Sequence, residues 1–265
     1  MERKTIILTG ASSGIGYQLC LKLAEEKHNI VIAARSIEKL EELAEKCKNL
    51  GADILTVKTD VSVKSECENL IEEVVKKYGN IDILINNAGI GMNASLEEVK
   101  DLDVFKNIMD INYFGTVYCS YYALKYLIKS KGLIVGISSL QGKTGFIKST
   151  GYVASKWAMQ GFLESLRIEL KNYGVDISII YPGPINTEIK RFDAAGKLVP
   201  RDDKYNRNTN VMPLEECVRQ ILKAIKNRQR ETVMTFQGKL IPWIKLIAPG
   251  FLDKQILKAV NKFYY

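Results

Sequence analysis

Short runs of apolar, largely β-branched residues alternate with longer helical patterns along most of this chain. The runs at 6–8 and 83–85 are apolar throughout, which is typical of strands buried on both faces of a sheet. Strict alternation of such strands with helices predicts an α/β domain with one doubly wound parallel sheet of about seven strands, flanked by helices on both faces. We expect strands at 5–9, 30–34, 53–58, 81–86, 133–138, 176–181 and 232–236, and helices at 15–27, 37–50, 64–78, 105–130, 153–173 and 214–227.

The length of the chain fits one domain of this kind. With 265 residues, 46% of them hydrophobic, it can build one full core more readily than two small ones, so we assign 1–265 to a single domain. The alternation breaks twice. Residues 184–212 carry Pro, Gly, Asn and many charges, which predicts a substrate lid. Residues 239–265 form a basic tail with several aromatic residues.

The composition of the chain excludes several kinds of active site and binding partner. The only histidine is His28, so a His-dependent triad or a multi-histidine metal site is nearly excluded. The five cysteines have no metal-ligand spacing and suggest no disulfide framework, and we expect no bound metal. A net charge of +8 favours anionic partners, but the basic, aromatic stripe of a nucleic-acid binder is missing. Without a signal peptide or an apolar run that could span a bilayer, we expect a cytoplasmic location.

A glycine-rich segment at 9–16 joins the first expected strand to the first expected helix. Its glycines permit a tight turn and a close backbone approach. The helix N-terminus then offers N–H groups and a positive dipole end to a pyrophosphate. The alternative is a tight turn that binds no ligand. We expect a dinucleotide to be held here by Gly10, Ser12, Ser13, Gly14, Ile15 and Gly16.

The next two strand ends bear on which dinucleotide binds. An acid after the second strand would bind the ribose hydroxyls of NAD, but this position holds Ala34, followed by Arg35. Because arginine offers forked donors to a phosphate, we expect NADP(H) to be preferred over NAD(H); the alternative is a surface arginine. After the third strand, Asp60 and Val61 can contact the adenine, although Asp60 can equally cap the next helix.

Three further strand ends carry candidate binding residues. Asn87 suits close packing beneath a cofactor, or a structural turn in which amides tie neighbouring loops together. Ser139 can donate a hydrogen bond to a substrate oxygen. Ile185 and Thr187 can fix a nicotinamide amide, or they merely begin the lid. All these positions fall at the carboxyl edge of the sheet, where ligands bind in open α/β folds.

Tyr152 and Lys156 lie one helical turn apart on the same helix face. A lysine charge near a tyrosine favours the phenolate and lowers the tyrosine pKa toward neutrality. Such a tyrosine can give a proton to a carbonyl or take one from an alcohol. The spacing is common on solvated helices, so its weight comes from the other motifs. With no histidine nearby, Tyr152 is the strongest acid/base candidate.

Taken together, these motifs resemble the short-chain dehydrogenase/reductase family from residue 5 to about residue 236. The resemblance implies a Rossmann-type fold and a role for each matching residue. Tyr152 would be the acid/base, and Lys156 would bind the nicotinamide ribose and lower the Tyr152 pKa. Ser139 would orient the carbonyl, and Asn112 would hold a water in a proton relay. The residues that carry the likeness are 9–16, 86–89, Asn112, Ser139, Tyr152, Lys156 and 182–183.

Comparison within the family bears on the cofactor, on the branch of the family and on subunit pairing. The absence of an acid at Ala34 looks like the NADP-preferring members, although those often carry a basic residue where Ser13 stands. The segment 138–143 looks like the branch of 11β-hydroxysteroid dehydrogenase and its bacterial relatives. Helices equivalent to 105–130 and 153–173 pair between subunits in the family, so we expect a homodimer or homotetramer; core packing explains part of the same pattern.

The expected function is an NADP(H)-dependent oxidoreductase that interconverts a carbonyl and a secondary alcohol by hydride transfer. The alternative is a non-catalytic NADP-binding sensor or scaffold on the same fold. Phe146, Ile147, Leu198, Val199 and Met212 favour an apolar substrate, or reflect ordinary lid packing. The basic, aromatic tail suits peripheral membrane contact, but we favour a tail folded onto the lid or a partner subunit.

Overall fold

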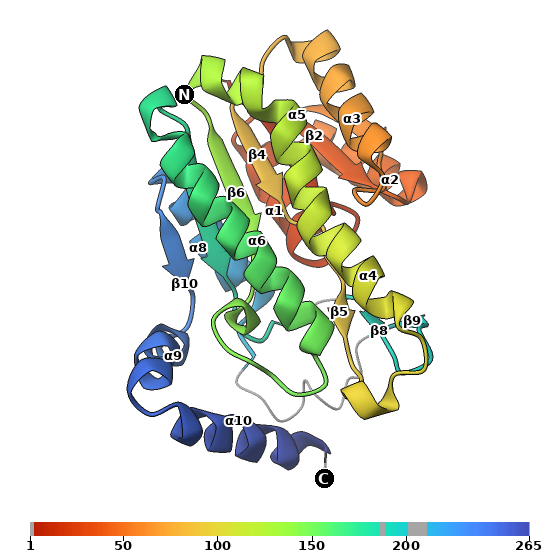
Figure 1. Ribbon diagram of the computed structural model, residues 1–265. Helices are drawn as coiled ribbons and strands as arrows, with labels where there is room; N and C mark the ends of the chain where they lie inside the picture. Colours follow the sequence, from red (N-terminus) through yellow and green to blue (C-terminus); the bar gives the residue numbers. More distant parts are fainter. Residues whose placement is uncertain (1–2, 186–188, 201–210, 265) are drawn as a thin grey trace.

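The computed structural model describes residues 3–185, 189–200 and 211–264, with side chains as far as residue 258. A central sheet of seven strands has the order β10-β7-β6-β4-β1-β2-β3, and all neighbouring strands are parallel. The prediction of a doubly wound parallel sheet is therefore confirmed (Figure 1). The strands are β1 Thr5–Thr9, β2 Asn29–Ala34, β3 Asp53–Lys58, β4 Ile83–Asn86, β6 Leu133–Ile137, β7 Asp176–Tyr181 and β10 Glu231–Val233.

Helices cover both faces of this sheet. Successive side chains of β1 point to opposite faces: Ile6 and Leu8 enter one apolar core, and Ile7 enters the other. All three are buried, which explains why the middle of this strand is apolar at three consecutive positions. The first core is closed by α1 Gly14–Glu25, α2 Ile37–Asn49 and α8 Leu214–Lys226, and the second by α3 Lys64–Tyr78, α5 Gly115–Ser130 and α6 Thr150–Glu169.

The helix expected at 105–130 is interrupted. It begins as α4 (Asp103–Met109), passes through a π-helical turn at Asp110–Phe114, and continues as α5. The extra residue in a π turn rotates the following side chains, and such turns often lie at functional sites. Here the turn contains Asn112, which is fully buried. A hydrophobic period alone could not reveal this interruption, because it continues on both sides of the turn.

A second, small sheet of three short strands lies beside the sheet edge where ligands were expected (Figure 1). It consists of β5 Gly91–Met92, β8 Arg191–Phe192 and β9 Leu198–Val199. Phe192 is buried in a cluster with Ile90, Met92 and Val104, so part of the expected lid is anchored to the body of the domain. Strands of two residues have no readable period, and the sequence did not predict them.

The tail forms two helices that the sequence did not predict, α9 Phe236–Ile247 and α10 Pro249–Tyr264. The expected strand 232–236 ends early because the Thr235 hydroxyl accepts a hydrogen bond from the Gly238 N–H at 3.0 Å and caps α9. Large apolar side chains stay exposed on both helices, among them Trp243, Leu246 and Phe251. Contact of this surface with a membrane or a partner subunit stays a prediction. In the part of the chain that the structure describes, no helix is long and apolar enough to cross a bilayer.

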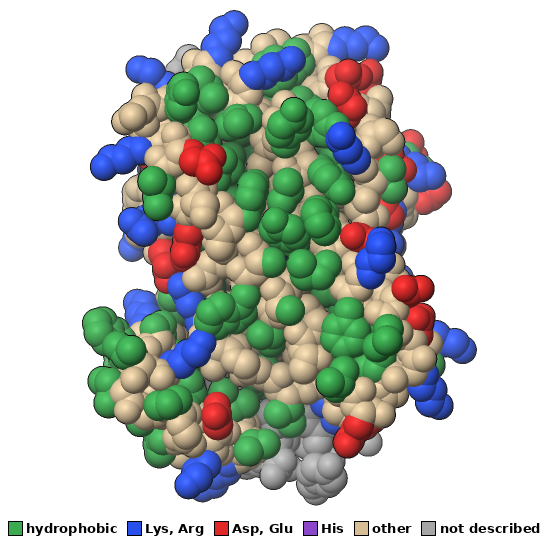
Figure 2. Space-filling view, viewed as in Figure 1, with side chains coloured by type: hydrophobic (Ala, Val, Ile, Leu, Met, Phe, Trp, Pro, Cys, Tyr) green, Lys and Arg blue, Asp and Glu red, His purple; other side chains and the backbone are tan. Residues whose placement is uncertain are grey.

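Apolar side chains also gather over α5 and α6 on the face seen in Figure 2. Tyr121 and Trp157 are both exposed there, and Phe114 lies just before α5 and is partly exposed. These are the helices that we expected to pair between subunits. Assembly into a homodimer or homotetramer stays a prediction.

Candidate active site

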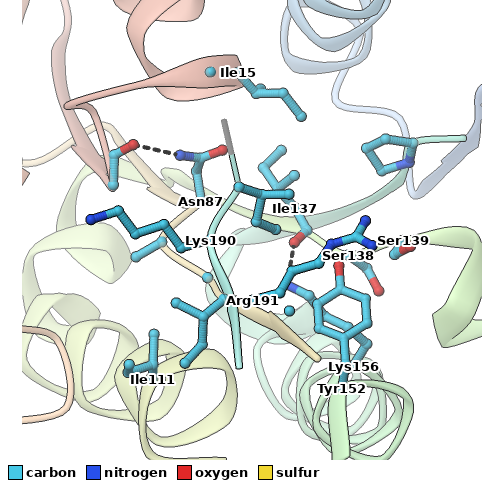
Figure 3. A pocket seen from close by; sticks show the side chains of 18 of the residues that line it. Ile15, Asn87, Ile111, Ile137, Ser138, Ser139, Tyr152, Lys156, Lys190 and Arg191 are labelled. Atoms are coloured by element: carbon cyan, nitrogen blue, oxygen red, sulfur yellow. Dashed lines mark hydrogen bonds between the residues drawn. The ribbon is translucent and has the colours of Figure 1, made fainter. Parts of the chain in front are cut away.

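A cleft of about 1070 Å³ runs along the carboxyl edge of the central sheet. Parallel strands all end at this edge, so the residues that follow them meet there although they are distant in sequence. Most of the predicted binding residues line it (Figure 3). They are Gly10, Ser12, Ser13, Gly14, Ile15, Arg35, Asp60, Val61, Asn87, Ser139, Tyr152, Lys156 and Ile185. Gly16 and Asn112 do not line it, and Thr187 lies outside the described residues.

The glycine-rich loop is packed so tightly at Gly10 and Gly16 that no side chain fits at either position. Gly10 has a positive φ of 66°, and a Cβ on it would lie 2.7 Å from the Ala88 Cα. A Cβ on Gly16 would lie 2.6 Å from the Asn87 Nδ2. That amide donates to the backbone oxygens of Thr9 and Gly10, at 2.9 and 3.1 Å. Gly16 therefore acts by allowing this close packing, and Asn87 has the loop-tying role that the sequence left open.

The N-terminus of α1 opens toward the cleft. Ser13 precedes this helix without capping it through its side chain, and the first turn contains no acidic residue. Free N–H groups and the positive end of the helix dipole make such a terminus suited to phosphate. The loop and the helix start therefore fit the pyrophosphate of a dinucleotide.

Basic residues gather at the end of the cleft that follows β2. Arg35 lines it with its side chain half exposed, and its Nη1 lies 4.0 Å from an Asp60 carboxylate oxygen. The other Asp60 oxygen accepts hydrogen bonds from the Ser62 N–H and hydroxyl at 3.0 and 2.6 Å. Asp60 thus caps the turn before α3 while still facing the cleft. Lys39, in the first turn of α2, also lines this end of the cleft, and the sequence did not predict it.

Tyr152 and Lys156 lie on α6 with Ser139 beside them (Figure 3). The Lys156 ammonium is 5.7 Å from the centre of the Tyr152 ring and donates a hydrogen bond to the Ile137 carbonyl at 2.9 Å. Lys156 is only 3% exposed. The Ser139 side chain acts on the Tyr152 hydroxyl and lowers its pKa. Two hydroxyls and a buried cation therefore line the same cleft, with the cation 5.7 Å from the Tyr152 ring.

The expected lowering of the Tyr152 pKa is wrong for this structure. Burial raises the pKa of Tyr152, and the neighbouring Ser139 side chain and the charge of Arg191 oppose that rise without cancelling it. Burial also lowers the pKa of Lys156 to about 8. The lysine is directed at the Ile137 carbonyl rather than at the phenol, which is why its charge does not dominate at Tyr152.

Asn112 lies behind the cleft. Its Nδ2 donates to the Ile90 carbonyl and the Ser155 hydroxyl, both at 2.9 Å, and its Oδ1 accepts from the Ile90 N–H at 2.8 Å. The side chain therefore ties the segment after β4 to α6. The Asn112 Oδ1 is close to Gly89, and a Cβ on Gly89 would lie 3.2 Å from this oxygen. These contacts position the two segments, and the role of Asn112 in a proton relay stays a prediction.

Comparisons with known proteins agree with this geometry. A family model described as short chain dehydrogenase matches residues 4–197. The chain belongs to the short-chain dehydrogenase family. It is 36% identical over 262 residues to a dehydrogenase/reductase SDR family protein 7-like of Dictyostelium discoideum, covering 95% of this chain and 80% of that protein. It is 33% identical over 260 residues to an 11-beta-hydroxysteroid dehydrogenase of Pinus massoniana, covering 96% of this chain and 73% of that protein.

The short-chain dehydrogenase fold is also found in a solved structure of similar shape. An alcohol dehydrogenase from the archaeon Thermococcus sibiricus, complexed with 5-hydroxy-NADP, superposes with a TM-score of 0.77 at 24% identity. The match covers 88% of this chain and 96% of that chain. Membership of the family makes this chain an oxidoreductase that acts on carbonyl or alcohol groups with a nicotinamide dinucleotide.

The end of the cleft near Tyr152 is called the carbonyl end here. Its lining differs from the one that the sequence predicted. Of the residues predicted to form an apolar substrate wall, only Phe146 lines the cleft. Leu198 packs in the cluster beneath β8, and Met212 packs against the core, so lid packing accounts for both. Ile90 and Met92 line the cleft, as expected for the segment 89–92, together with Ile241 of α9 and Ile256 of α10.

Two cationic residues at this end were also missed. Lys190 and Arg191 line the cleft, and Arg191 reaches toward Tyr152 (Figure 3). Arg191 belongs to no motif that could have identified it. It reaches the site only because β8 pairs with β5, which is distant in sequence.

Proposed function

We propose that this short-chain dehydrogenase is NADP(H)-dependent and interconverts a carbonyl and a secondary alcohol, with Tyr152 as the acid/base. The observation that carries the proposal is the presence of Tyr152, Ser139 and Lys156 together in the lining of the dinucleotide cleft. A nicotinamide cofactor bound there supplies or accepts the hydride at the carbonyl carbon.

The residues present fit such a cofactor. The glycine loop and the open α1 N-terminus suit the pyrophosphate. Arg35 and Lys39, with Ala34 in place of an acid, support a 2′-phosphate and hence NADP(H) over NAD(H). Ile185 lies where the lid begins and suits the nicotinamide. This chain therefore has a complementary group for each part of the dinucleotide.

The protein's own part in the reaction is to hold and move a proton. In the reducing direction, the Tyr152 hydroxyl donates its proton to the carbonyl oxygen as that oxygen gains charge. The Ser139 hydroxyl donates a hydrogen bond to the same oxygen and keeps it aligned. Lys156 keeps a positive charge close to the phenolate that is left behind, and the Ile137 carbonyl fixes its position. In the oxidising direction the same groups act in reverse.

The test is NADPH oxidation by the purified protein on a panel of ketones and aldehydes, with wild type and Tyr152→Phe. We expect Tyr152→Phe to lose about 10²-fold to 10⁴-fold in kcat because the proton donor is gone. The dissociation constant of NADPH should stay within about twofold, because the phenyl ring still fills its place. Tyr173→Phe is the matched control, since Tyr173 is exposed in the short 3-10 helix that follows α6. Full activity in Tyr152→Phe contradicts the proposal, and tight NADPH binding with no turnover of any carbonyl favours a non-catalytic sensor.

A further inference from the structure

The helices α9 and α10 carry apolar side chains on more than one face. On the inner face, Ile241 of α9 and Ile256 of α10 line the cleft. The outer face of α9 is an exposed stripe of apolar side chains at helical spacing, namely Phe236, Leu240, Trp243 and Ile247. Figure 2 shows apolar side chains gathered over this helix at the lower left of the view. A helix that is apolar on opposite faces is normally covered on both, and the described part of the chain does not cover this stripe.

Lysines border the apolar side chains of the outer face. On α9, Lys239 follows Phe236 by three residues and lies beside the stripe. On α10, Lys254 and Lys258 follow the exposed Phe251 by three and seven residues and therefore share its face. All three lysines are exposed, and no carboxylate in the described part of the chain pairs with them. The outer face thus combines apolar side chains with unpaired positive charge.

This charge decides among the partners that could cover the outer face. The only acidic residue of the two helices is Asp253, so the face is strongly basic. In a twofold dimer through it, Lys239, Lys254 and Lys258 of one copy would meet the same lysines of the other and repel them. An anionic bilayer suits both kinds of side chain, because its acyl region receives apolar groups and its headgroups attract lysine. Trp243 suits the headgroup level, since its indole is apolar with one polar N–H.

We propose that the outer face of α9 and α10 binds the surface of an anionic phospholipid bilayer. The apolar side chains insert shallowly between the headgroups, and the lysines contact the lipid phosphates and carboxylates. This inference does not depend on the reaction proposed at Tyr152. Because Ile241 and Ile256 belong to the same two helices, the bound protein holds this wall of the cleft next to the membrane.

The experiment measures co-sedimentation of the full chain with vesicles of phosphatidylcholine alone and of phosphatidylcholine with about one-third phosphatidylserine. Ile247→Asp tests the apolar stripe, and Ile168→Asp is its matched control. Both isoleucines lie in the last turn of a helix, α9 and α6, and they are 79% and 77% exposed. Either aspartate therefore faces water in the free protein, and the thermal midpoint of both variants should equal that of wild type.

A pair of double variants tests the charge. Lys254→Gln with Lys258→Gln removes two lysines of the outer face. Lys125→Gln with Lys129→Gln is the matched control, because these lysines are exposed on α5 at the same spacing. The chain has two tryptophans, so Trp157→Phe leaves Trp243 as the only one and its emission reports where this side chain lies.

We expect wild type to bind the anionic vesicles, to bind the neutral ones much more weakly, and to be released by added salt. Ile247→Asp should weaken binding by about tenfold or more, the range for losing one buried isoleucine. The double variant of α10 should weaken it by about 30-fold, at about fivefold for each lysine. Both controls should stay within about twofold, and the Trp243 emission should move to shorter wavelength when vesicles bind.

Four outcomes overturn the proposal, and none of them involves turnover, so the proposed function is tested separately. Failure of wild type to bind anionic vesicles removes the membrane as the partner. Equal binding to neutral and anionic vesicles removes the role of the lysines. An equal loss in Ile247→Asp and Ile168→Asp, or binding without a change in Trp243 emission, moves the contact to another surface. A smaller particle for Ile247→Asp than for wild type, measured by light scattering without vesicles, assigns the outer face to a second copy of the chain.

Discussion

The two ends of the cleft are built in different ways. At the nucleotide end, the shape comes from backbone crowding around Gly10 and Gly16, held by the Asn87 amide. At the carbonyl end, the shape comes from long side chains that are brought in by distant segments, namely Arg191 from β8, Ile241 from α9 and Ile256 from α10.

Because of this difference, the two ends of the cleft tolerate amino-acid substitution to different extents. A backbone cradle tolerates almost no substitution, because any added atom collides with a neighbouring main chain. A wall of side chains can be altered one residue at a time while the strands and helices beneath it keep their packing. The nucleotide end therefore fits one class of ligand, and the carbonyl end is where members of one family can come to differ in substrate.

The largest effect should come from adding a side chain to the cradle. In Gly16→Val, the new Cβ is forced against the Gly10 carbonyl and the Asn87 amide, so the loop must open. We expect NADPH affinity to fall by more than about 100-fold, measured by fluorescence titration, with some loss of stability.

Gly161→Ala is the matched control for this variant. Gly161 also lies on a helix, α6, but no atom lies within 4 Å of a Cβ placed on it. The alanine should raise the free energy of unfolding by about 0.5–1 kcal/mol and leave NADPH binding unchanged. Normal NADPH binding by Gly16→Val would contradict the contrast between the two ends, because the nucleotide end would then tolerate substitution as the carbonyl end does.

The same contrast explains how far the sequence could predict this structure. The strands β1, β3 and β7 lie where they were expected, because each forms a run of strand-favouring residues bounded by turn signals. The glycine loop was predicted as well, since its residues lie at fixed offsets from a strand end and a helix start. Arg35, Asp60 and Ser139 followed from the same rule, because each lies one or two residues after the end of a strand.

The unpredicted features depend on contacts between distant segments or on local hydrogen bonds. Arg191 enters the site only through the pairing of β8 with β5. The π turn at Asn112 depends on hydrogen bonds to Ile90 and Ser155, which no helical period encodes. The early end of β10 depends on the cap that Thr235 gives to α9. The Tyr152 pKa was mispredicted because spacing on a helix says nothing about burial.

Lys156 lies between the two ends of the cleft. Its replacement should raise the free energy of unfolding, whereas Gly16→Val should lower it. Its pKa of about 8 in the folded protein is below the ordinary 10.5, so the unfolded chain binds this proton more tightly. The penalty for burying the charge is fully present below pH 8 and is relieved as the pH rises toward 10.5. It amounts to about 3 kcal/mol at pH 7.

We therefore expect Lys156→Met to be more stable than wild type at neutral pH while losing turnover. The lost hydrogen bond to Ile137 offsets about 1 kcal/mol, which leaves a net gain of about 2 kcal/mol at pH 7. Urea unfolding at pH 7 and pH 10 measures the gain, which should shrink at the higher pH. Lys125→Met, which removes an exposed lysine from α5, should change little at either pH. A gap between Lys156→Met and wild type that does not depend on pH would mean that the pKa of the buried amine is not lowered and that Lys156 stays as fully charged in the folded protein as in the unfolded chain.

The smallest effect should come from the one part of the nucleotide end that uses side chains. Arg35 is half exposed, so water and salt screen its attraction for a 2′-phosphate. We expect Arg35→Ser to weaken NADPH binding by about tenfold and NADH binding by less than twofold, with the NADPH effect shrinking as salt is added. Arg219→Ser, which removes an exposed arginine paired with Glu216 on α8, should change neither. An equal loss for both cofactors would place Arg35 at the shared adenosine rather than at the phosphate, and the preference for NADP(H) would then depend on Lys39 alone.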